Sequence, residues 1–418
     1  MGLEPLEPAE ISHCATRESA RQVSGVRQNT AEFKGVLAGV GALGGVLAGL
    51  WSREAWGTWT YVDDDLLRPH NVIRHIAGDA FIGCSKAEAV LAEASSSFYP
   101  GYAPGAAIHA RISDWSHPGL ADVLAGAALL VDVTTTLEAP RDLSARDGVP
   151  RAASVFLTPS GMGSVMLLED RARLVRLDAL EAQYYRAILY QKWGEEHLAG
   201  HRGHLWVGAG CRDISLVMSH EVVQAHGATL ARQLRLSSER DEAQIRVWSL
   251  DDGTGGISAH AVRVSRPLAS QCGAWRIVWD EHLRERLFTR RASCLPSETG
   301  GILLGYHDLK LKTLHLVDAL PAPSDSEADT TGFTRGVQGL REALERCARL
   351  TGHIVGYVGE WHSHPRGTGA SPSRLDLALL AELADRMAQD GLPELMLIVG
   401  EVEVRLMLGE NMPCAHHG

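Results

Sequence analysis

The stretch "GEWHSHPRGTGASPSRLD", residues 359–376, contains two histidines separated by one residue, followed by a serine and an aspartate. Residues 356–364, "GYVGEWHSH", alternate as in a β-strand, so His362 and His364 are predicted to project from the same face. That spacing allows two imidazoles to reach one ion. The stretch is therefore either a histidine-rich turn or part of a metal centre.

A helix is predicted directly after this turn. The segment "SPSRLDLALLAELADRMAQDG", residues 371–391, has the apolar period of a helix, with Ser371 as N-cap, Pro372 at the first helical position and a final glycine as its stop. Ser373 and Asp376 are three residues apart and share a face of this helix. The dipole at a helix N-terminus favours the ionised carboxylate, which is the form that binds metal.

Two imidazoles and one carboxylate leave one tetrahedral position open on zinc, as in a catalytic rather than a closed structural site. Such a site also needs a proton acceptor, and Glu298 in "SETGGILLG" is the candidate because its glycine neighbours allow a close backbone approach. The alternative is two exposed histidines in a loop and an aspartate in the first turn of a helix. The combination of motifs favours the metal centre.

These residues resemble the JAB/MPN metalloprotease (JAMM) family, whose pattern is a glutamate, then His-x-His-Pro, then Ser-x-x-Asp. The family includes deubiquitinases and bacterial enzymes that cut after the C-terminal glycine of ubiquitin-like proteins. The resemblance implies that His362, His364 and Asp376 ligate Zn²⁺, that Glu298 handles the proton and that Ser373 steadies the oxyanion. The loop "RGTGA" makes the histidine–aspartate spacing one residue longer than is commonest in the family.

A second motif, "AGVGALGG" at residues 38–45, lies between a predicted strand and a predicted helix. Its glycines let backbone N–H groups and the helix N-terminus face phosphates, and this pattern fits NAD as well as ATP. The polar and cationic residues that follow favour a triphosphate. The candidate nucleotide-binding residues before the next strand are Gly39, Gly41, Gly44, Asp63, Asp65, Asn71, Arg74 and Lys86.

This region resembles the ThiF-type adenylation domain of ubiquitin-activating enzymes, in particular the bacterial versions. The resemblance implies that Asp63 or Asp65 binds the ribose or a metal, and that Asn71, Arg74 and Lys86 hold the phosphates. Asp132 in "LLVDVTTT" takes the place of a carboxylate directed at Mg²⁺. Thr135 replaces a further aspartate of many relatives, so an α/β sheet that has lost nucleotide binding is the alternative.

Cys211 in "GAGCRDISLV" matches the cysteine that receives the adenylated carboxylate as a thioester in such enzymes. Gly208 and Gly210 leave the thiol approachable, and Arg212 favours the thiolate. A cysteine that is merely packed at the end of a strand is the alternative. ThiF-type domains are usually dimers whose arms reach the neighbouring active site, and Arg21 or Arg27 would serve in that way.

The totals suit a bacterial cytoplasmic protein of more than one domain. The chain has 418 residues, a net charge of −11 and seven scattered cysteines, which argues against nucleic-acid binding and a disulfide framework. The apolar run 36–51 is too short and glycine-rich for a membrane span, so we expect no membrane association.

We expect an N-terminal tail or arm over residues 1–30, a ThiF-like adenylation domain with the catalytic-cysteine region over 31–268, and a JAB/MPN domain over 269–418. The predicted fold class is α/β, a ThiF/Rossmann-like doubly wound sheet followed by an α+β, cytidine-deaminase-like JAB/MPN domain. The boundary lies where the pattern breaks, at 266–273. A helix is expected over 175–200, and a mobile acidic loop over 321–332.

Together the two resemblances imply a fusion that processes a ubiquitin-like protein by zinc-dependent (iso)peptidase chemistry and activates its C-terminal glycine with ATP and Mg²⁺. The conjugating enzyme would be a separate protein, and similar bacterial systems often serve antiphage defence. One alternative is an enzyme that activates and processes a sulfur carrier. The other is an active JAMM protease beside a ThiF-like dimerisation platform without catalytic activity.

Overall fold

The computed structural model describes residues 15–97, 105–200, 204–206 and 214–409. The chain divides into two compact units. Unit 1 comprises residues 1–135, 148–150 and 219–239, and unit 2 comprises residues 136–147, 151–218 and 240–418. The domain boundaries expected from the sequence stay predictions.

Unit 1 contains four parallel strands in the order β3-β2-β1-β4. The order reverses beside β1, as in a Rossmann-like doubly wound sheet, so the carboxyl ends of β1, β2 and β4 share one edge. The elements of unit 1 are α1 (Arg17–Ser24), α2 (Gln28–Ala31), β1 (Lys34–Ala38), α3 (Ala42–Arg53), β2 (Thr58–Val62), η1 (Asp79–Phe81), α4 (Lys86–Ser95), β3 (Gly105–Ile108), α5 (Leu120–Gly126), β4 (Leu129–Asp132) and α8 (His220–Ser238).

The apolar run 36–51 forms β1, a glycine turn and most of α3, as predicted. Helix α3 approaches the turn so closely that a Cβ added to Gly44 would lie 2.0 Å from the carbonyl oxygen of Gly39. The far end of α3 enters an aromatic core, where Trp51 stacks on Trp59. In the part of the chain that the structure describes, no helix has the length and apolar character that a membrane crossing requires.

Arg21, one of two arginines predicted to reach the active site of a neighbouring subunit, is buried within its own unit. This side chain is only 3% exposed, and its guanidinium donates to the carbonyl oxygen of Ala55 and pairs with Glu32. Arg21 therefore stabilises unit 1 itself, and the proposed role for it is wrong. Arg27 forms an ion pair with Glu239.

Unit 2 contains two larger sets of strands. One set runs antiparallel in the order β10-β9-β6-β5, and the other is a seven-stranded sheet in the order β11-β12-β14-β13-β17-β18-β19. The elements up to the second sheet are α6 (Glu138–Ser144), β5 (Ala152–Leu157), β6 (Gly163–Leu168), α7 (Leu177–Tyr190), η2 (Lys192–Gly194), β7 (His204–Trp206), β8 (Ile214–Leu216), β9 (Gln244–Leu250) and β10 (Ile257–Val262).

The second sheet and its helices follow in chain order. They are β11 (Pro267–Cys272), β12 (Trp275–Asp280), α9 (Glu281–Cys294), β13 (Gly300–Asp308), β14 (Thr313–Ala319), β15 (Glu327–Ala328), β16 (Phe333–Thr334), α10 (Leu340–Leu350), β17 (Gly356–Ser363), α11 (Arg374–Met387), η3 (Ala388–Asp390), β18 (Glu394–Val399) and β19 (Val404–Gly409).

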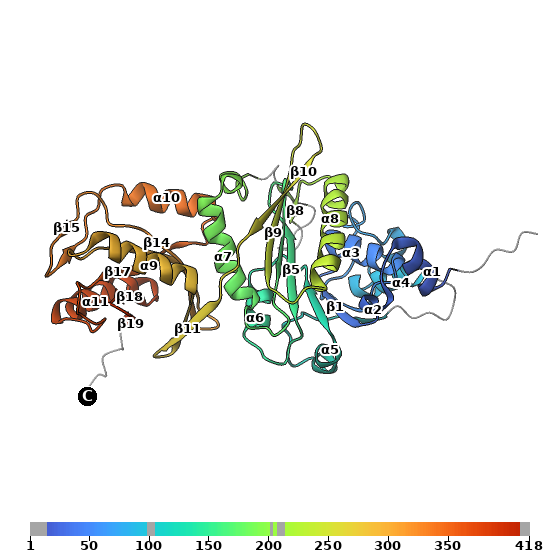
Figure 1. Cartoon of the computed structure of the whole chain (residues 1–418). Coiled ribbons are helices and arrows are strands. Elements are labelled where there is room, and N and C mark those ends of the chain that lie inside the picture. Colours follow the sequence, from blue (N-terminus) through green and yellow to red (C-terminus); the bar gives the residue numbers. More distant parts are fainter. Residues whose placement is uncertain (1–14, 98–104, 201–203, 207–213, 410–418) are drawn as a thin grey trace, which may run out of the picture. The chain divides into compact units, whose positions relative to one another are not determined.

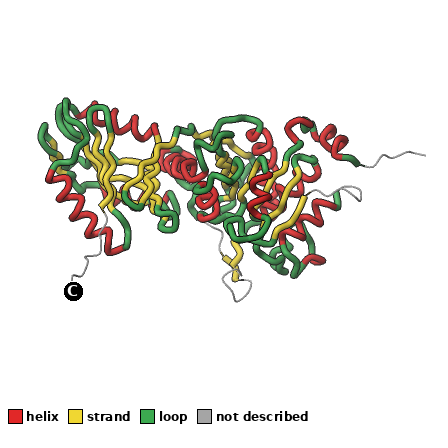
Figure 2. The backbone as a smooth tube through the Cα atoms, turned by 90° about the horizontal axis from the view of Figure 1, so that it is seen from below, coloured by secondary structure: helices red, strands yellow, loops and turns green. Residues whose placement is uncertain are grey.

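Helices accompany the seven-stranded sheet (Figures 1 and 2), and each face of the sheet carries a core of buried side chains. Leu283 and Leu287 of α9 pack on the face that bears Trp361, whereas Leu380 of α11 packs on the opposite face against Met396. His362 follows Trp361 in β17 and therefore faces the α11 side. The sheet thus presents one imidazole toward the start of the helix that carries Asp376.

Three sequence predictions differ from the structure. The segment 266–273, where a break in the pattern was expected, contains strand β11. This strand lies at the edge of its sheet, where proline and polar residues are tolerated, so its sequence resembles that of a loop. The helix expected over 175–200 ends at Tyr190. The loop 321–332, expected to be mobile, includes β15, which pairs with β16.

Candidate active sites

Three potential metal ligands meet at the amino end of α11. His362 is in β17, His364 lies just beyond that strand, and Asp376 is in the first turn of the helix. One ligand atom from each residue lies within 4.8 Å of the others. The carboxylate oxygens of Asp376 are 3.2 Å from His362 Nε2 and 3.9 Å from His364 Nε2. The predicted grouping of these residues is therefore present, although the insertion lengthens the loop between them.

His364 is oriented by its surroundings. Its Nδ1 lies 2.7 Å from the carbonyl oxygen of Gly369, so this nitrogen carries the proton and Nε2 is left with a lone pair for a metal. Arg291, buried on α9, donates 2.8 Å hydrogen bonds to the carbonyl oxygens of His364 and Pro365. Sequence reasoning missed Arg291, because nothing in a helical arginine indicates a distant loop as its partner.

Asp376 is fixed by a reciprocal capping interaction. The Ser373 hydroxyl accepts the Asp376 N–H, and the Asp376 carboxylate accepts the Ser373 N–H. The N-cap is therefore Ser373. The sequence-based prediction of Ser371 as the N-cap is wrong. Burial opposes ionisation of Asp376, but His362 and the hydrogen bonds with Ser373 outweigh it and hold the pKa of this carboxyl well below its usual value.

The donor set fits a zinc ion. His362 Nε2 is buried and has no hydrogen-bond partner within the described part of the chain, although it faces the carboxylate of Asp376. A buried nitrogen without a partner is costly, and coordination of a cation removes that cost. Two imidazole nitrogens and one carboxylate oxygen form the set typical of catalytic zinc, with a position left for water.

Glu298 lies beside this cluster, just before β13. The first residue of that strand, Gly300, is paired with His362 of β17. The backbone N–H of Glu298 donates to the carbonyl oxygen of Asp329. Burial raises the pKa of Glu298, while His362 and His364 counteract this effect. The carboxyl group is thus near the ligands and partly withdrawn from water, as a proton carrier requires.

A polar strip continues from His362 along the same face of the sheet. Glu360 pairs with Arg335 at 2.8 Å, and the hydroxyl of Tyr357 donates to Glu394 at 2.5 Å. Glu394 is fully buried, and its second carboxylate oxygen has no hydrogen-bond partner in the described chain. Burial is the main reason that the pKa of Glu394 is raised to about 7.

The raised pKa of Glu394 predicts a stability change with pH. Between the ordinary value near 4.5 and about 7 the folded protein keeps a proton that the unfolded chain releases, so stability falls as the pH rises through this window. Glu394→Gln removes this loss. With zinc in excess, we expect the variant and wild type to be similar at pH 4.5 and the variant to be more stable at pH 8 by about 3 kcal/mol.

Denaturant unfolding at the two pH values measures this difference. Glu342→Gln, at an exposed position on α10, is the matched control and should follow the wild-type curve. If the difference between Glu394→Gln and wild type stays constant with pH, the pKa of Glu394 is not raised in the folded protein and the prediction is wrong.

In unit 1 the predicted nucleotide residues gather at the carboxyl edge of the parallel strands. The glycine-rich turn follows β1, Asp63 follows β2 and Asp132 ends β4. The carboxylate of Asp63 accepts hydrogen bonds from the backbone N–H groups of Val40 at 2.8 Å and of Asp65 at 2.9 Å. It therefore shapes the glycine-rich turn.

The remaining phosphate candidates are near this turn. Lys86, the first residue of α4, pairs with Asp65 at 2.9 Å. Asn71 and Arg74 share one short turn, and the adjacent His75 ring nitrogen lies 2.9 Å from the carbonyl oxygen of Val40. The structure thus links the Asn-x-x-Arg segment to the glycine-rich turn through a histidine that sequence reasoning did not single out.

The proposed magnesium carboxylate is engaged within its own loop. Asp132 is buried and accepts hydrogen bonds from the backbone and hydroxyl groups of Thr134. Thr135 adopts a left-handed backbone conformation, with φ of 58°. Cys211, the predicted thioester residue, lies outside the described residues.

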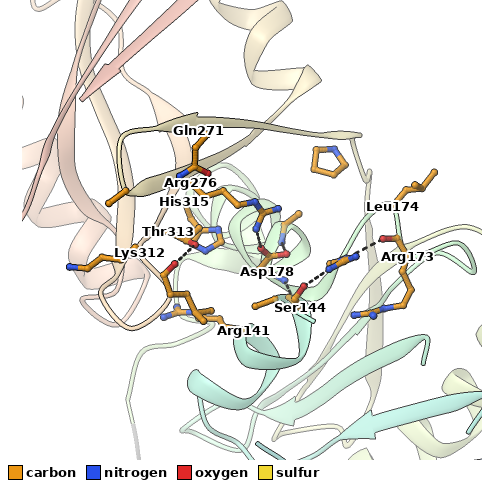
Figure 3. A pocket seen from close by; sticks show the side chains of 16 residues that line it. Arg141, Ser144, Arg173, Leu174, Asp178, Gln271, Arg276, Lys312, Thr313 and His315 are labelled. Atoms are coloured by element: carbon orange, nitrogen blue, oxygen red, sulfur yellow. Dashed lines mark hydrogen bonds and ion pairs between the residues drawn. The ribbon is translucent and has the colours of Figure 1, made fainter. Parts of the chain in front are cut away.

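Unit 2 also contains a cavity of about 600 Å³, separate from the metal ligands (Figure 3). Its polar wall includes Arg141, Arg173, Arg176 and Arg276, and each of these pairs with a carboxylate. In Figure 3, Arg276 reaches Asp178, 3.3 Å away. These ion pairs hold the four arginines in place around the cavity.

The seven-stranded sheet thus carries a cluster of two imidazoles and one carboxylate that could hold a metal ion, with a glutamate beside it. Residues 280–409 match the family model of prokaryotic homologues of the JAB domain. A protein of Enterobacter hormaechei subsp. hoffmannii (strain UCI 50) named CD-NTase/cGAS isopeptidase is 35% identical over 132 residues, which cover 32% of this chain and 71% of that protein. The chain belongs to the prokaryotic JAB family, and its α/β fold class with a JAB domain is as predicted.

Solved structures also align with much of the chain. E. coli MccB with ATP is 11% identical, with a TM-score of 0.40 over 58% of this chain and 66% of that one. PaaA is 12% identical, with a TM-score of 0.39 over 62% of this chain and 78% of that one. For MccB with succinimide the chain spans 64% of the aligned protein's length.

Proposed function

We propose that this chain is a zinc-dependent isopeptidase that releases ubiquitin-like proteins from targets or precursors, fused to a domain that activates their C-terminal glycine with ATP. The observation that supports the peptidase half is the cluster of His362, His364 and Asp376 beside Glu298. The related Enterobacter protein is named as an isopeptidase, and we extend that reaction class to this chain.

The residues have separate tasks in amide hydrolysis. Zinc held by the three ligands would supply Lewis acidity toward the scissile carbonyl and the attacking water. Glu298 takes a proton from the water while the water oxygen bonds to the carbonyl carbon. It then gives this proton to the leaving nitrogen as the C–N bond breaks. The Ser373 oxygen accepts the Asp376 N–H, so its own proton can stabilise the oxyanion.

Removal of a zinc ligand tests the metal centre. We expect purified wild type to hold one zinc ion per chain and His362→Ala to hold much less, because two protein ligands do not retain the ion. His282→Ala, at an exposed histidine of unit 2, should keep the wild-type zinc content. Metal analysis after dialysis measures both, and equal zinc in all three proteins would refute this centre.

The adenylation half is supported by the shared edge of β1, β2 and β4, where the glycine-rich turn, Asp63 and the Asp65–Lys86 pair meet. ATP would place its phosphates against the turn, with Asn71, Arg74 and Lys86 as partners. Asp132, which accepts hydrogen bonds from Thr134, is the carboxylate that would face Mg²⁺, because Thr135 offers none. A thioester on Cys211, dimerisation and a separate conjugating enzyme belong to the same proposal.

Exchange of labelled pyrophosphate into ATP tests this half. Exchange that depends on a glycine-ended ubiquitin-like protein supports activation. Absence of exchange with every such protein tested supports the alternative of a docking platform. Formation of a thiocarboxylate in the presence of sulfide would instead favour the sulfur-carrier alternative. A cytoplasmic location remains part of the expectation from the sequence.

A further inference from the structure

The cavity of about 600 Å³ in unit 2 is formed by two parts of the chain. One part lies in α6 and around the start of α7, and the other in β11, β12 and β14 and the turns beside them. In Figure 3, Arg276 and Asp178 lie between His315 and Arg173. The nucleotide candidates belong to unit 1, and the metal ligands do not line this cavity. The cavity is therefore a feature that the proposed function does not use.

The charged side chains that line the cavity are mostly cationic. They are Arg141, Arg173, Arg176, Arg276 and Lys312, and in the described part of the chain Asp178 alone adds a carboxylate to the lining. The carboxylates that pair with three of the arginines, Glu181, Glu169 and Asp147, do not line the cavity. An occupant of the cavity would thus meet a surface rich in guanidinium groups.

Two of these arginines are committed to buried ion pairs. Arg141 donates hydrogen bonds of 2.8 and 2.6 Å to the two carboxylate oxygens of Glu181, and Arg173 pairs with Glu169 at 2.6 Å. Each of these side chains is about nine-tenths buried. Because breaking a buried ion pair is costly, Arg141 and Arg173 are expected to keep their partners.

The other two arginines have donors to spare. The side chain of Arg276 is 43% exposed and contacts Asp178 through one Nη atom at 3.3 Å, although a guanidinium has five N–H groups. Arg176 precedes the first residue of α7, and its partner Asp147 is 91% exposed, so this pair contributes little and is readily exchanged. Both guanidiniums can therefore bind an anion without the loss of a buried ion pair.

A buried imidazole beside the cavity provides a second observation. His315 is only 1% exposed, and its Nδ1 has no hydrogen-bond partner among the residues that the structure describes. Burial lowers the pKa of His315, so the ring is neutral at neutral pH and one of its nitrogens can donate a hydrogen bond. A buried polar atom without a partner indicates a polar occupant nearby.

We propose that this cavity binds a small molecule bearing a diphosphate group, held by Arg176 and Arg276. The planar fork of arginine pairs with two phosphate oxygens at once, and a diphosphate can engage both guanidiniums. Its higher charge also favours it over a single carboxylate, which Asp178 already supplies. Free pyrophosphate and a nucleoside diphosphate share this chemistry, and the volume is typical of small-molecule sites. The proposal is independent of the peptidase and adenylation functions.

Calorimetric titration of the zinc-loaded full chain with inorganic pyrophosphate tests the proposal. All proteins carry Lys86→Ala, which weakens phosphate binding at the candidate nucleotide site of unit 1, so that the cavity is measured. We expect Arg276→Met and Arg176→Met each to weaken pyrophosphate binding by about tenfold or more, because each removes charge-assisted hydrogen bonds. Arg276→Lys should be intermediate, since it keeps the charge but loses the fork.

Arg284→Met is the control, because it removes the same charge at an exposed position of α9 that does not line the cavity, and it should keep the affinity of the Lys86→Ala parent. Denaturant unfolding and zinc content identify any variant that has lost its fold, and the other arginine variant then decides. Binding that is insensitive to Arg176→Met and Arg276→Met would overturn the proposal, as would equally tight binding of succinate.

A parallel titration with ADP distinguishes the two sources of the diphosphate group. Tighter binding of ADP than of pyrophosphate, with the same dependence on Arg276, supports a nucleoside diphosphate as the ligand. Tighter binding of pyrophosphate with that dependence supports the free diphosphate. Absence of binding by both probes would refute the site.

Discussion

Glu298→Gln is expected to reduce cleavage of a C-terminally extended, glycine-ended ubiquitin-like protein by a factor of about 10² to 10⁴, the usual contribution of a positioned proton carrier. The amide has nearly the shape of the carboxyl group but cannot accept the proton of water. The backbone N–H of Glu298 keeps its hydrogen bond to the carbonyl oxygen of Asp329, so the segment 320–339 should not move. The loss should appear in kcat, with zinc content unchanged.

Single-turnover cleavage together with metal analysis measures this effect. Glu285→Gln, at an exposed position of α9, is the control for a glutamate in the same unit and should cleave like wild type. Cleavage by Glu298→Gln within tenfold of wild type would show that another group carries the proton. Loss of zinc from the variant would instead give Glu298 a structural task at the metal centre.

The grouping of His362, His364 and Asp376 could be predicted from the sequence because it depends on local structure. A one-residue spacing in a strand places His362 and His364 together, and Ser-x-x-Asp is a helix start whichever serine caps it. The cap itself was misassigned because Ser371-Pro372 also has the form of a helix start. Only the structure distinguishes it from Ser373, whose side chain accepts the N–H of Asp376.

The supports of the site could not be predicted in the same way, because they act across long sequence separations. Arg291 binds the carbonyl oxygens of His364 and Pro365 from 73 and 74 residues away. The segment 320–339, between β14 and α10, has the composition of a free loop. Its conformation depends on contacts made by Asp325 and Arg335 and on the close approach of Phe333 to Gly300 of β13. No local pattern reports such contacts.

Breaking the buried pair of Arg186 and Asp280 should strongly lower the stability of unit 2. Arg186 lies on α7, and its Nη atoms donate to both carboxylate oxygens of Asp280 at 2.9 and 2.6 Å, while its Nε donates to the carbonyl oxygen of Val317. Asp280 also caps α9 through the N–H of Leu283. Both side chains are at least nine-tenths buried.

Asp280→Ala is expected to lower the free energy of unfolding by about 3–5 kcal/mol, because a buried guanidinium loses its counter-charge and α9 loses its N-cap. Asp241→Ala removes the partner of Arg171 in an exposed pair and should cost at most about 1 kcal/mol, as measured by denaturant unfolding.

The double variant Arg186→Met/Asp280→Ala separates the two costs. It removes the unpaired charge as well, so it should recover part of the stability that Asp280→Ala loses, while the lost cap remains. Equal losses in the single and double variants would assign the whole effect to the cap. Since Arg291 of α9 also holds the backbone of His364, a displaced α9 should weaken zinc binding in Asp280→Ala, whereas Asp241→Ala should leave it intact.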